Sequence, residues 1–173
     1  GGTGLRWGCL PVKMLLDGMR GSKPQGGRAA LRRTAARLEE VERRLEQTLH
    51  STGVEIRLGE ASFLDAHAVS VAGTTLRAES IVLATGTRPA APPGIELDGS
   101  FVISHEDFFK RSQVPRRTAV VGADVEGVEF ALLLAGLSAK VELIDLKREI
   151  LPGQDRDLVK PVEEDLAARG VRI

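Results

Sequence analysis

Cysteine is nearly absent from this sequence: the chain of 173 residues contains only Cys9. A single cysteine excludes an internal disulfide framework and fits a reducing compartment, so we expect a cytoplasmic protein. Basic and acidic residues are equal in number, 24 each, so no excess charge indicates binding to nucleic acid or to a membrane surface. No apolar run approaches the roughly 18 residues of a membrane span, and no secretory signal is visible. We therefore expect neither nucleic acid nor membrane as a partner.

We expect a fragment from the two ends of the sequence, and removal of the start by processing is the alternative. The first residue is Gly1 rather than a methionine, and the chain stops at Ile173, where a new strand is expected to begin. The apolar share of 42% is ordinary for a soluble α/β protein and leaves that class open.

The stretch from Thr118 to Asp145 predicts a strand, a glycine turn, a helix and a second strand. Thr118–Val121 is short and rich in β-branched residues, which is typical of a strand buried on both faces. Val128–Leu137 carries apolar residues at helical spacing, and Lys140–Ile144 alternates as a strand. An acidic residue at the end of that strand, about 20 residues after the turn, is typical of a dinucleotide-binding βαβ unit.

The turn departs from the G-x-G-x-x-G fingerprint of such units. Its three positions are Gly122, Asp124 and Gly127, so a carboxylate stands where the backbone should approach the pyrophosphate. Glu126 adds a second negative charge beside the helix N-terminus, which normally favours an anion. A purely structural crossover is the alternative. The predicted nucleotide contacts are Gly122, Ala123, Asp124, Val125, Glu126, Gly127, Val128 and Glu129.

Asp145 predicts the type of nucleotide. A carboxylate at this place accepts a hydrogen bond from the ribose 2′-OH and repels a 2′-phosphate, which favours NAD over NADP. Lys147 and Arg148 lie close enough in sequence to soften that preference.

The remaining segments predict a mixture of helices and short strands. A long amphipathic helix begins at Ala29 and ends at Thr52-Gly53, and three alternating runs between Ala61 and Glu79 predict an antiparallel meander. Ser104 and Asp107 are placed to cap a helix at His105–Lys110. Further strands are expected at 54–58, 80–84 and 101–103, and a helix at 158–169. His50 is expected to cap the long helix or to lie on the surface, and His105 is expected to be exposed. His67 is expected in a turn, without a catalytic role.

The N-terminal segment carries a pattern of glycines with one cysteine and one lysine. By this pattern the chain resembles the flavin-dependent pyridine nucleotide–disulfide oxidoreductases, whose redox segment reads G-G-T-C-x4-C-x-P-x-K. The matching positions here are Gly1, Gly2, Thr3, Gly4, Gly8, Cys9, Pro11 and Lys13. The long helix, the meander and the βαβ unit follow in the order that this family has. A run A-T-G-x-x-P, from Ala84 to Pro89, also matches the family.

The resemblance implies roles for individual residues. Cys9 would face the flavin, although a small buried residue is the other interpretation. Lys13 would reach the flavin ring and pair with Glu129, which would face the nicotinamide. Gly4 stands where the family has its first cysteine, so no intramolecular disulfide can form. The FAD contacts that the resemblance implies are Gly1, Gly2, Thr3, Gly4, Lys13, Gly59, Thr85, Gly86 and Thr87.

We therefore expect an α/β protein with a Rossmann-like FAD/NAD(P)-binding fold. Residues 1–100 would form part of an FAD-binding domain without its first βαβ unit, and residues 101–173 part of an NAD-binding domain. The expected function is hydride transfer from NADH to FAD and on to a small-molecule acceptor, with no metal site. The alternative is a non-catalytic homologue that keeps only the nucleotide-binding fold. The full-length protein is expected to form a homodimer.

Overall fold

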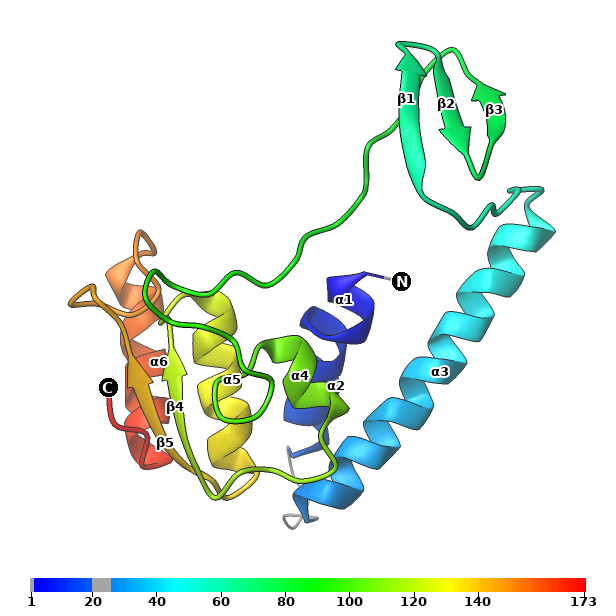
Figure 1. Cartoon of the computed structure of the whole chain (residues 1–173). Coiled ribbons are helices and arrows are strands. Elements are labelled where there is room, and N and C mark those ends of the chain that lie inside the picture. Colours follow the sequence, from blue (N-terminus) through cyan, green and yellow to red (C-terminus); the bar gives the residue numbers. More distant parts are fainter. Residues whose placement is uncertain (1, 20–25) are drawn as a thin grey trace. The chain divides into compact units, whose positions relative to one another are not determined.

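The fold was obtained as a computed structural model, which describes residues 2–19 and 26–173 (Figure 1). Its contacts divide the chain into two compact units. Unit 1 comprises Gly1–Glu39 and Arg88–Ile173, and unit 2 comprises Glu40–Thr87.

A parallel strand pair joined by a helix forms the centre of unit 1. Strands β4 (Arg117–Val121) and β5 (Lys140–Ile144) pair in parallel, with Val121 opposite Ile144, and α5 (Val125–Gly136) connects them. Parallel strands need a crossover connection of this kind. The predicted βαβ unit is confirmed. Burial alternates along β4, however, and Val121 is exposed, so the expectation of a strand buried on both faces is wrong.

The chain adds a further helix and the start of a third strand beyond β5. Helix α6 (Arg156–Ala168) contributes Val159 and Leu166 to the core and contains Pro161 in its second turn. Arg172 then bridges to Glu142 in parallel orientation, as the predicted new strand requires.

Of the two N-terminal helices, the second packs against α5 and the first packs against the second. They are α1 (Thr3–Arg6) and α2 (Cys9–Gly18), and Val12 and Leu15 of α2 are buried. At Gly136 an added Cβ would lie 2.4 Å from the Met19 Sδ, so the absence of a side chain lets these two segments approach closely.

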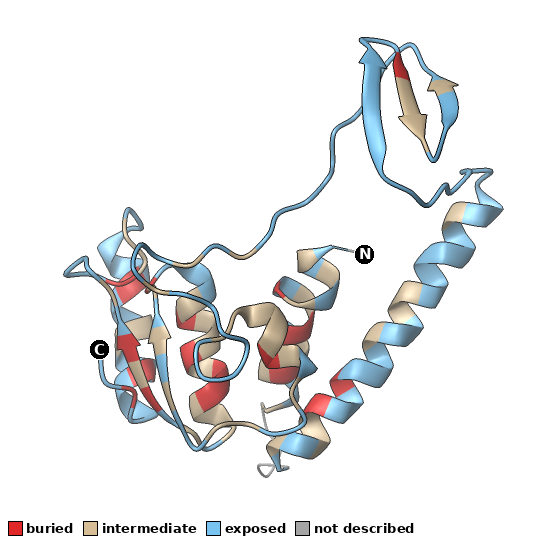
Figure 2. Ribbon diagram, in the orientation of Figure 1, coloured by how far each residue is buried: buried red, intermediate tan, exposed pale blue. Residues whose placement is uncertain are grey.

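Helix α3 (Gly27–Ser51) confirms the predicted long amphipathic helix. Only Leu31 and Thr34 among its residues are buried, and both belong to unit 1. Figure 2 shows the buried residues of unit 1 gathered on the helices and strands around α5. The largest fully buried side chains include Leu133, Leu143 and Leu166.

Helix α4 (His105–Lys110) begins with the predicted capping box. The Ser104 hydroxyl accepts from the Asp107 N–H, and the Asp107 side chain accepts from the Ser104 N–H. His105 is half-buried rather than exposed, and no partner for its Nε2 is found in the described part of the chain. The strand predicted at 101–103 is wrong, because the Asp98 Oδ1 accepts three successive backbone N–H groups and folds the segment into a loop.

Unit 2 contains an antiparallel meander. Its strands are β1 (Ala61–Asp65), β2 (Ala68–Val71) and β3 (Thr74–Arg77), in the order β1-β2-β3, as predicted. His67 lies in the turn between β1 and β2, where its Nδ1 is 3.0 Å from the Glu79 carbonyl oxygen.

Two strands predicted in unit 2 are not formed. Residues 54–58 and 80–84 have no strand pairing, and both segments are largely exposed, with Leu58 at 89% and Val82 at 87%. A strand is stable only when a neighbour completes its hydrogen bonds, and the described residues of unit 2 offer these segments no such neighbour.

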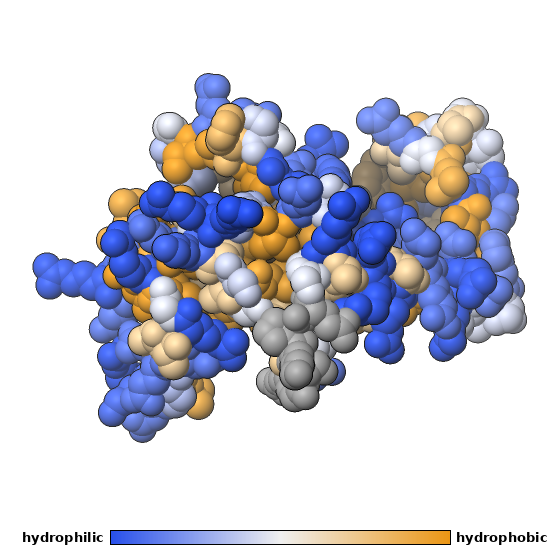
Figure 3. Space-filling view, turned by 90° about the horizontal axis from the view of Figure 1, so that it is seen from below, coloured by the Kyte–Doolittle hydropathy of each residue, from blue (hydrophilic) through white to orange (hydrophobic). Residues whose placement is uncertain are grey.

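The surface mixes polar and apolar side chains. Figure 3 shows hydrophilic residues over much of the face seen from below, with apolar patches between them. Across residues 2–19 and 26–173, no helix has both the length and the apolar composition needed to cross a membrane. The same residues include no group of three or more His, Cys, Asp and Glu side chains arranged to hold a metal ion.

Candidate functional site

An ion pair joins the N-terminal segment to the βαβ unit. The Lys13 Nζ on α2 donates to the Glu129 Oε1 on α5 over 2.9 Å. The Lys13 side chain is 61% exposed and that of Glu129 is 23% exposed, so the pair faces solvent rather than the core. The hydrogen bond from Glu129 raises the pKa of Lys13 above its ordinary value, so the ammonium form is favoured. The predicted pairing of these two side chains is confirmed.

Buried neighbours fix the backbone on both sides of this pair. Val12 precedes Lys13 and is fully buried, while Val128 precedes Glu129 and is also buried. Phe130 follows Glu129, and its ring meets that of Phe108 edge-on at a centroid distance of 5.5 Å. Because Val128 and Phe130 both face the core, helical spacing points the Glu129 side chain away from the core, where it reaches Lys13 on α2.

Cys9 lies one helical turn before Lys13, in the first turn of α2. A spacing of four residues places both side chains on the same helix face. The thiol is exposed, so the interpretation of Cys9 as a small buried residue is wrong. Gly4 lies in α1, where an added Cβ would have no atom within 4 Å. Gly1 is outside the described residues, and Gly2 is the N-cap of α1 with a φ of 89°.

The two outer glycines of the βαβ turn are required by its geometry. Gly122 has a φ of +106°, which residues with a side chain rarely adopt. A Cβ at Gly127 would lie 1.8 Å from the Gly122 carbonyl oxygen, so strand and helix can approach this closely only with glycine there. These are two of the three functions that glycine serves in a dinucleotide-binding turn.

Asp124 occupies the middle position as the N-cap of α5. Its φ of −77° is open to any residue, and its side chain accepts a hydrogen bond from the Val125 N–H at 2.8 Å. Among the residues described, no acceptor contacts the backbone N–H groups of Glu126 and Gly127. The helix therefore keeps two free donors at its N-terminus, beside two carboxylates.

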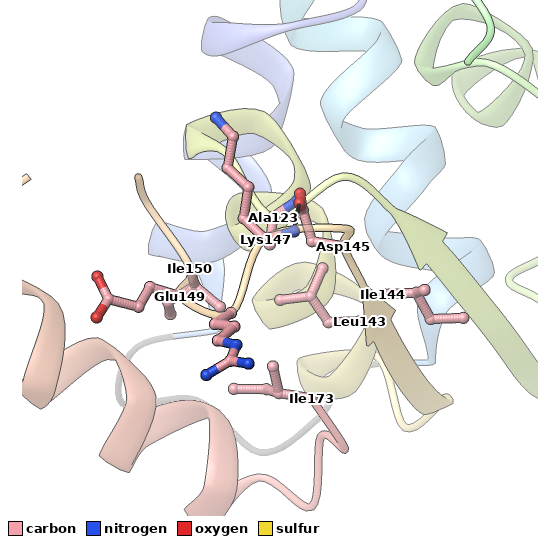
Figure 4. Close-up of a pocket in the computed structure, with 9 residues that line it drawn as sticks. Ala123, Leu143, Ile144, Asp145, Lys147, Glu149, Ile150 and Ile173 are labelled. Carbon is pink, nitrogen blue, oxygen red and sulfur yellow. Dashed lines mark hydrogen bonds between the residues drawn. The ribbon is translucent and has the colours of Figure 1, made fainter. Parts of the chain in front are cut away.

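A pocket of about 320 Å³ lies at the carboxyl end of β5 (Figure 4). Asp145 stands at its wall, where Oδ2 accepts from the Ala123 N–H and Oδ1 from the Lys147 N–H, each at 2.7 Å. These bonds, the one from Lys147 above all, hold the pKa of Asp145 below its ordinary value. The lining residues are Ala123, Leu143, Ile144, Asp145, Lys147, Arg148, Glu149, Ile150 and Ile173.

Sequence reasoning missed the contribution of Leu151. This residue has a φ of 49°, and its N–H donates to the Ala123 carbonyl oxygen at 2.7 Å. The following Pro152-Gly153 pair marks a turn, but nothing in the pattern shows what the turn contacts.

The whole chain, residues 1–173, matches the family model described as pyridine nucleotide-disulphide oxidoreductase. The chain belongs to this family. Its identity to dihydrolipoyl dehydrogenase 2 from Haloarcula marismortui is 30%, over 99% of this chain and 41% of that protein. Its identity to glutathione reductase from Nostoc sp. is 32%, over 100% of this chain and 40% of that protein.

A solved structure supports the fold. The HOCl-induced flavoprotein disulfide reductase RclA from Escherichia coli superposes with a TM-score of 0.88 at 24% identity, over 100% of this chain and 40% of that one. The predicted α/β, Rossmann-like class is confirmed. The chain spans about two fifths of the length of the relatives it matches.

The remaining predicted flavin contacts lie in unit 2. Gly59 precedes β1, and Thr85, Gly86 and Thr87 follow the meander in an exposed segment. Gly86 has a φ of 78°, the positive value expected of a glycine turn at this place. Their contact with a flavin stays a prediction.

Proposed function

We propose that this chain forms the part of an FAD-dependent oxidoreductase in which a nicotinamide nucleotide meets the flavin. The observation that carries the proposal is the 2.9 Å contact between Lys13 and Glu129. It brings the glycine-rich N-terminal segment and the nucleotide βαβ unit to one place, although 116 residues separate the two side chains. The names of the relatives support this assignment, since dihydrolipoyl dehydrogenase and glutathione reductase are among them.

The βαβ unit supplies the nucleotide side of the site. The free N–H groups of Glu126 and Gly127 would donate to the pyrophosphate, and Gly122 and Gly127 keep the turn narrow enough for it to approach. Ala123, Val125 and Val128 complete the predicted contacts. The scaffold fits a dinucleotide. The carboxylates of Asp124 and Glu126 oppose its phosphates, so we expect weak binding rather than none.

The N-terminal segment supplies the flavin side. When bound, FAD would accept a hydride from NADH. Gly2, Thr3 and Gly4 would lie along FAD with Gly59 and Thr85–Thr87, and Gly1 has the same predicted role. Lys13 would present its ammonium group to the flavin ring, held in place by Glu129. This group is charged at neutral pH even at the ordinary pKa of a lysine, and the hydrogen bond to Glu129 raises that pKa further.

The acceptor of the electrons is expected to be a small molecule that is not a disulfide. Thiol–disulfide exchange needs an attacking thiolate and a resolving partner, and Cys9 has no second cysteine in this chain. Oxygen, a quinone or a dye remain suitable acceptors. We retain NAD as the nucleotide, a homodimer for the full-length protein, a cytoplasmic location and a boundary near residue 100 as proposals.

A non-catalytic homologue is the second candidate. The observation that favours it is the pair of carboxylates, Asp124 and Glu126, at the expected phosphate position. Such a protein would keep the fold but bind the dinucleotide too weakly to react.

Flavin reduction in the protein that carries this chain tests the proposal. We expect bound yellow flavin to bleach on anaerobic addition of NADH, and K13M and E129Q to slow the bleaching by about tenfold or more, because each removes a charged group beside the reacting rings. K160M, an exposed lysine on α6, is the matched control and should not change the rate. Flavin that binds but stays yellow with NADH would establish the non-catalytic alternative.

A further inference from the structure

Helix α2 packs against α5 through contacts that include an ion pair and a thioether. The ion pair is the 2.9 Å contact between Lys13 and Glu129. The thioether belongs to Met19, the C-cap of α2, which lies against Gly136, the last residue of α5. Met19 follows Lys13 and Gly136 follows Glu129, so the two helices run past each other in the same direction. The helical rise separates the two contacts by roughly 10 Å along the helices.

The thioether contact depends on glycine at position 136. A Cβ there would come closer than 3.0 Å to the Met19 Sδ, a separation that real Cβ atoms essentially never show. The Arg169 Nη1 would lie 3.8 Å from the same Cβ, which is an ordinary contact. Gly136 does not have a positive φ, so its backbone conformation is open to other residues. The missing side chain therefore serves the close approach of Met19.

The ion pair cannot hold the two helices at this separation by itself. The Lys13 side chain is 61% exposed, and an exposed ion pair contributes little to stability because water screens the charges and two long side chains must be ordered. Apolar packing therefore determines where the ammonium group lies relative to Glu129. Val12 and Leu15 attach the middle of α2 to the core, and Met19 attaches its C-terminal end.

We propose that Met19 and Gly136 are positioning residues, whose contact sets the separation of α2 and α5 at which the Lys13 ammonium group reaches the Glu129 carboxylate. A methyl group at position 136 would push α2 away from α5 or displace the Met19 sulfur, and either movement loosens this end of α2. In the protein without ligands, the proposal concerns the packing of two helices. It rests on the proposed function only where flavin reduction is measured.

Titration of the Lys13 side chain by NMR is the first test, because the hydrogen bond to Glu129 is the main cause that raises its pKa above the ordinary 10.5. Cys9 also raises this pKa, but it lies on α2 together with Lys13, so a change between variants reports on Glu129. We expect G136A to return the pKa most of the way to its ordinary value, and M19A to lower it less. The double variant G136A/M19A should recover the raised pKa, because the shorter side chain makes room for the new methyl group.

The recovery separates a positioning role from a general loss of stability, since two independent destabilising substitutions would add. G18A is the matched control and should leave the pKa of Lys13 unchanged, because no atom lies within 4 Å of its Cβ. A Lys13 pKa in G136A equal to that of the parent would overturn the proposal, and so would a double variant that titrates like G136A. If G136A does not fold, an unchanged pKa in M19A overturns it instead.

Reduction of the flavin by NADH is the second test, in the protein that carries this chain. We expect G136A to slow the bleaching by about tenfold, because a small misplacement of a group beside the reacting rings is costly, and G136A/M19A to restore the rate. Bleaching in G136A at the parent rate would contradict the proposal. A parent protein whose flavin stays yellow refutes the proposed function, while the titration of Lys13 still decides the role of Met19 and Gly136.

Discussion

Substituting Gly127 by alanine tests the geometry on which the nucleotide turn depends. The added Cβ would lie 1.8 Å from the carbonyl oxygen of Gly122 and 2.8 Å from its carbonyl carbon. Real Cβ atoms essentially never come within 3.0 Å of such neighbours, so the turn must retreat by more than an ångström. The obstacle is backbone, which cannot rotate away as the end of a side chain can.

The retreat has a cost that the structure allows us to estimate. Moving Gly122 away from α5 strains its 2.8 Å hydrogen bond to Ile144 and the bond between Ala123 and Asp145. G127A combines overpacking with broken backbone hydrogen bonds, so its loss of stability should be among the larger ones that single substitutions cause. We expect a loss of about 3 kcal/mol or more in the free energy of unfolding.

Urea unfolding of the parent and of two matched glycine variants provides the measurement. G136A should lose about 1–2 kcal/mol, because its Cβ meets the Met19 Sδ, which belongs to a flexible side chain. G18A should change stability by about 1 kcal/mol at most, since nothing lies within 4 Å of its Cβ. A G127A protein that unfolds like G18A would refute the reasoning about the close approach of strand and helix.

Four further predictions concern the cap, the core and the phosphate position. S104A removes the N-cap of α4 and should cost about 1 kcal/mol in urea unfolding. The hydrogen bond from the Ser104 hydroxyl is the main reason why the pKa of Asp107 lies below its ordinary 3.8. The ionised Asp107 should therefore stabilise the fold fully above pH 3.8 and lose this contribution as the pH falls through its lowered pKa, which an NMR titration measures. L166A should cost about 2–5 kcal/mol because its side chain is fully buried. D124G combined with E126I should tighten NADH about tenfold in a fluorescence titration, and unchanged affinity would contradict the repulsion argument.

Local sequence patterns were sufficient wherever an element finds its partners nearby. The meander was predictable because its strands pair with immediate neighbours across short turns. The capping box at Ser104 and Asp107 was predictable for the same reason, since both hydrogen bonds lie within one helical turn. The βαβ unit followed from periodicity together with the glycine turn.

The strands that failed show what periodicity cannot specify. Segments 54–58 and 80–84 have apolar residues suited to strands, but strand formation depends on a partner and not on composition. Segment 101–103 failed for another reason, because Asp98 captures its N–H groups. A carboxylate can accept from many donors, and the sequence does not say which.

In the candidate site, the ion pair was predictable from the sequence, but the exposure of Cys9 and the hydrogen bonds of Asp145 were not. The contact of Lys13 with Glu129 was expected from the resemblance to a family and is present. The exposure of Cys9 and the backbone partners of Asp145 required the packed structure, because both depend on how α2 and the loop after β5 are placed.

Anaerobic reduction with paired acceptors tests the central claim most directly. The flavin-bound protein is mixed with NADH, and oxidised lipoamide or a quinone is then added. We expect the flavin to bleach with NADH, the quinone to restore its colour, and lipoamide to leave it bleached, because Gly4 stands where the family has the cysteine that would pair with Cys9. Flavin that NADH does not bleach, or a bleached flavin that lipoamide reoxidises, would contradict the account.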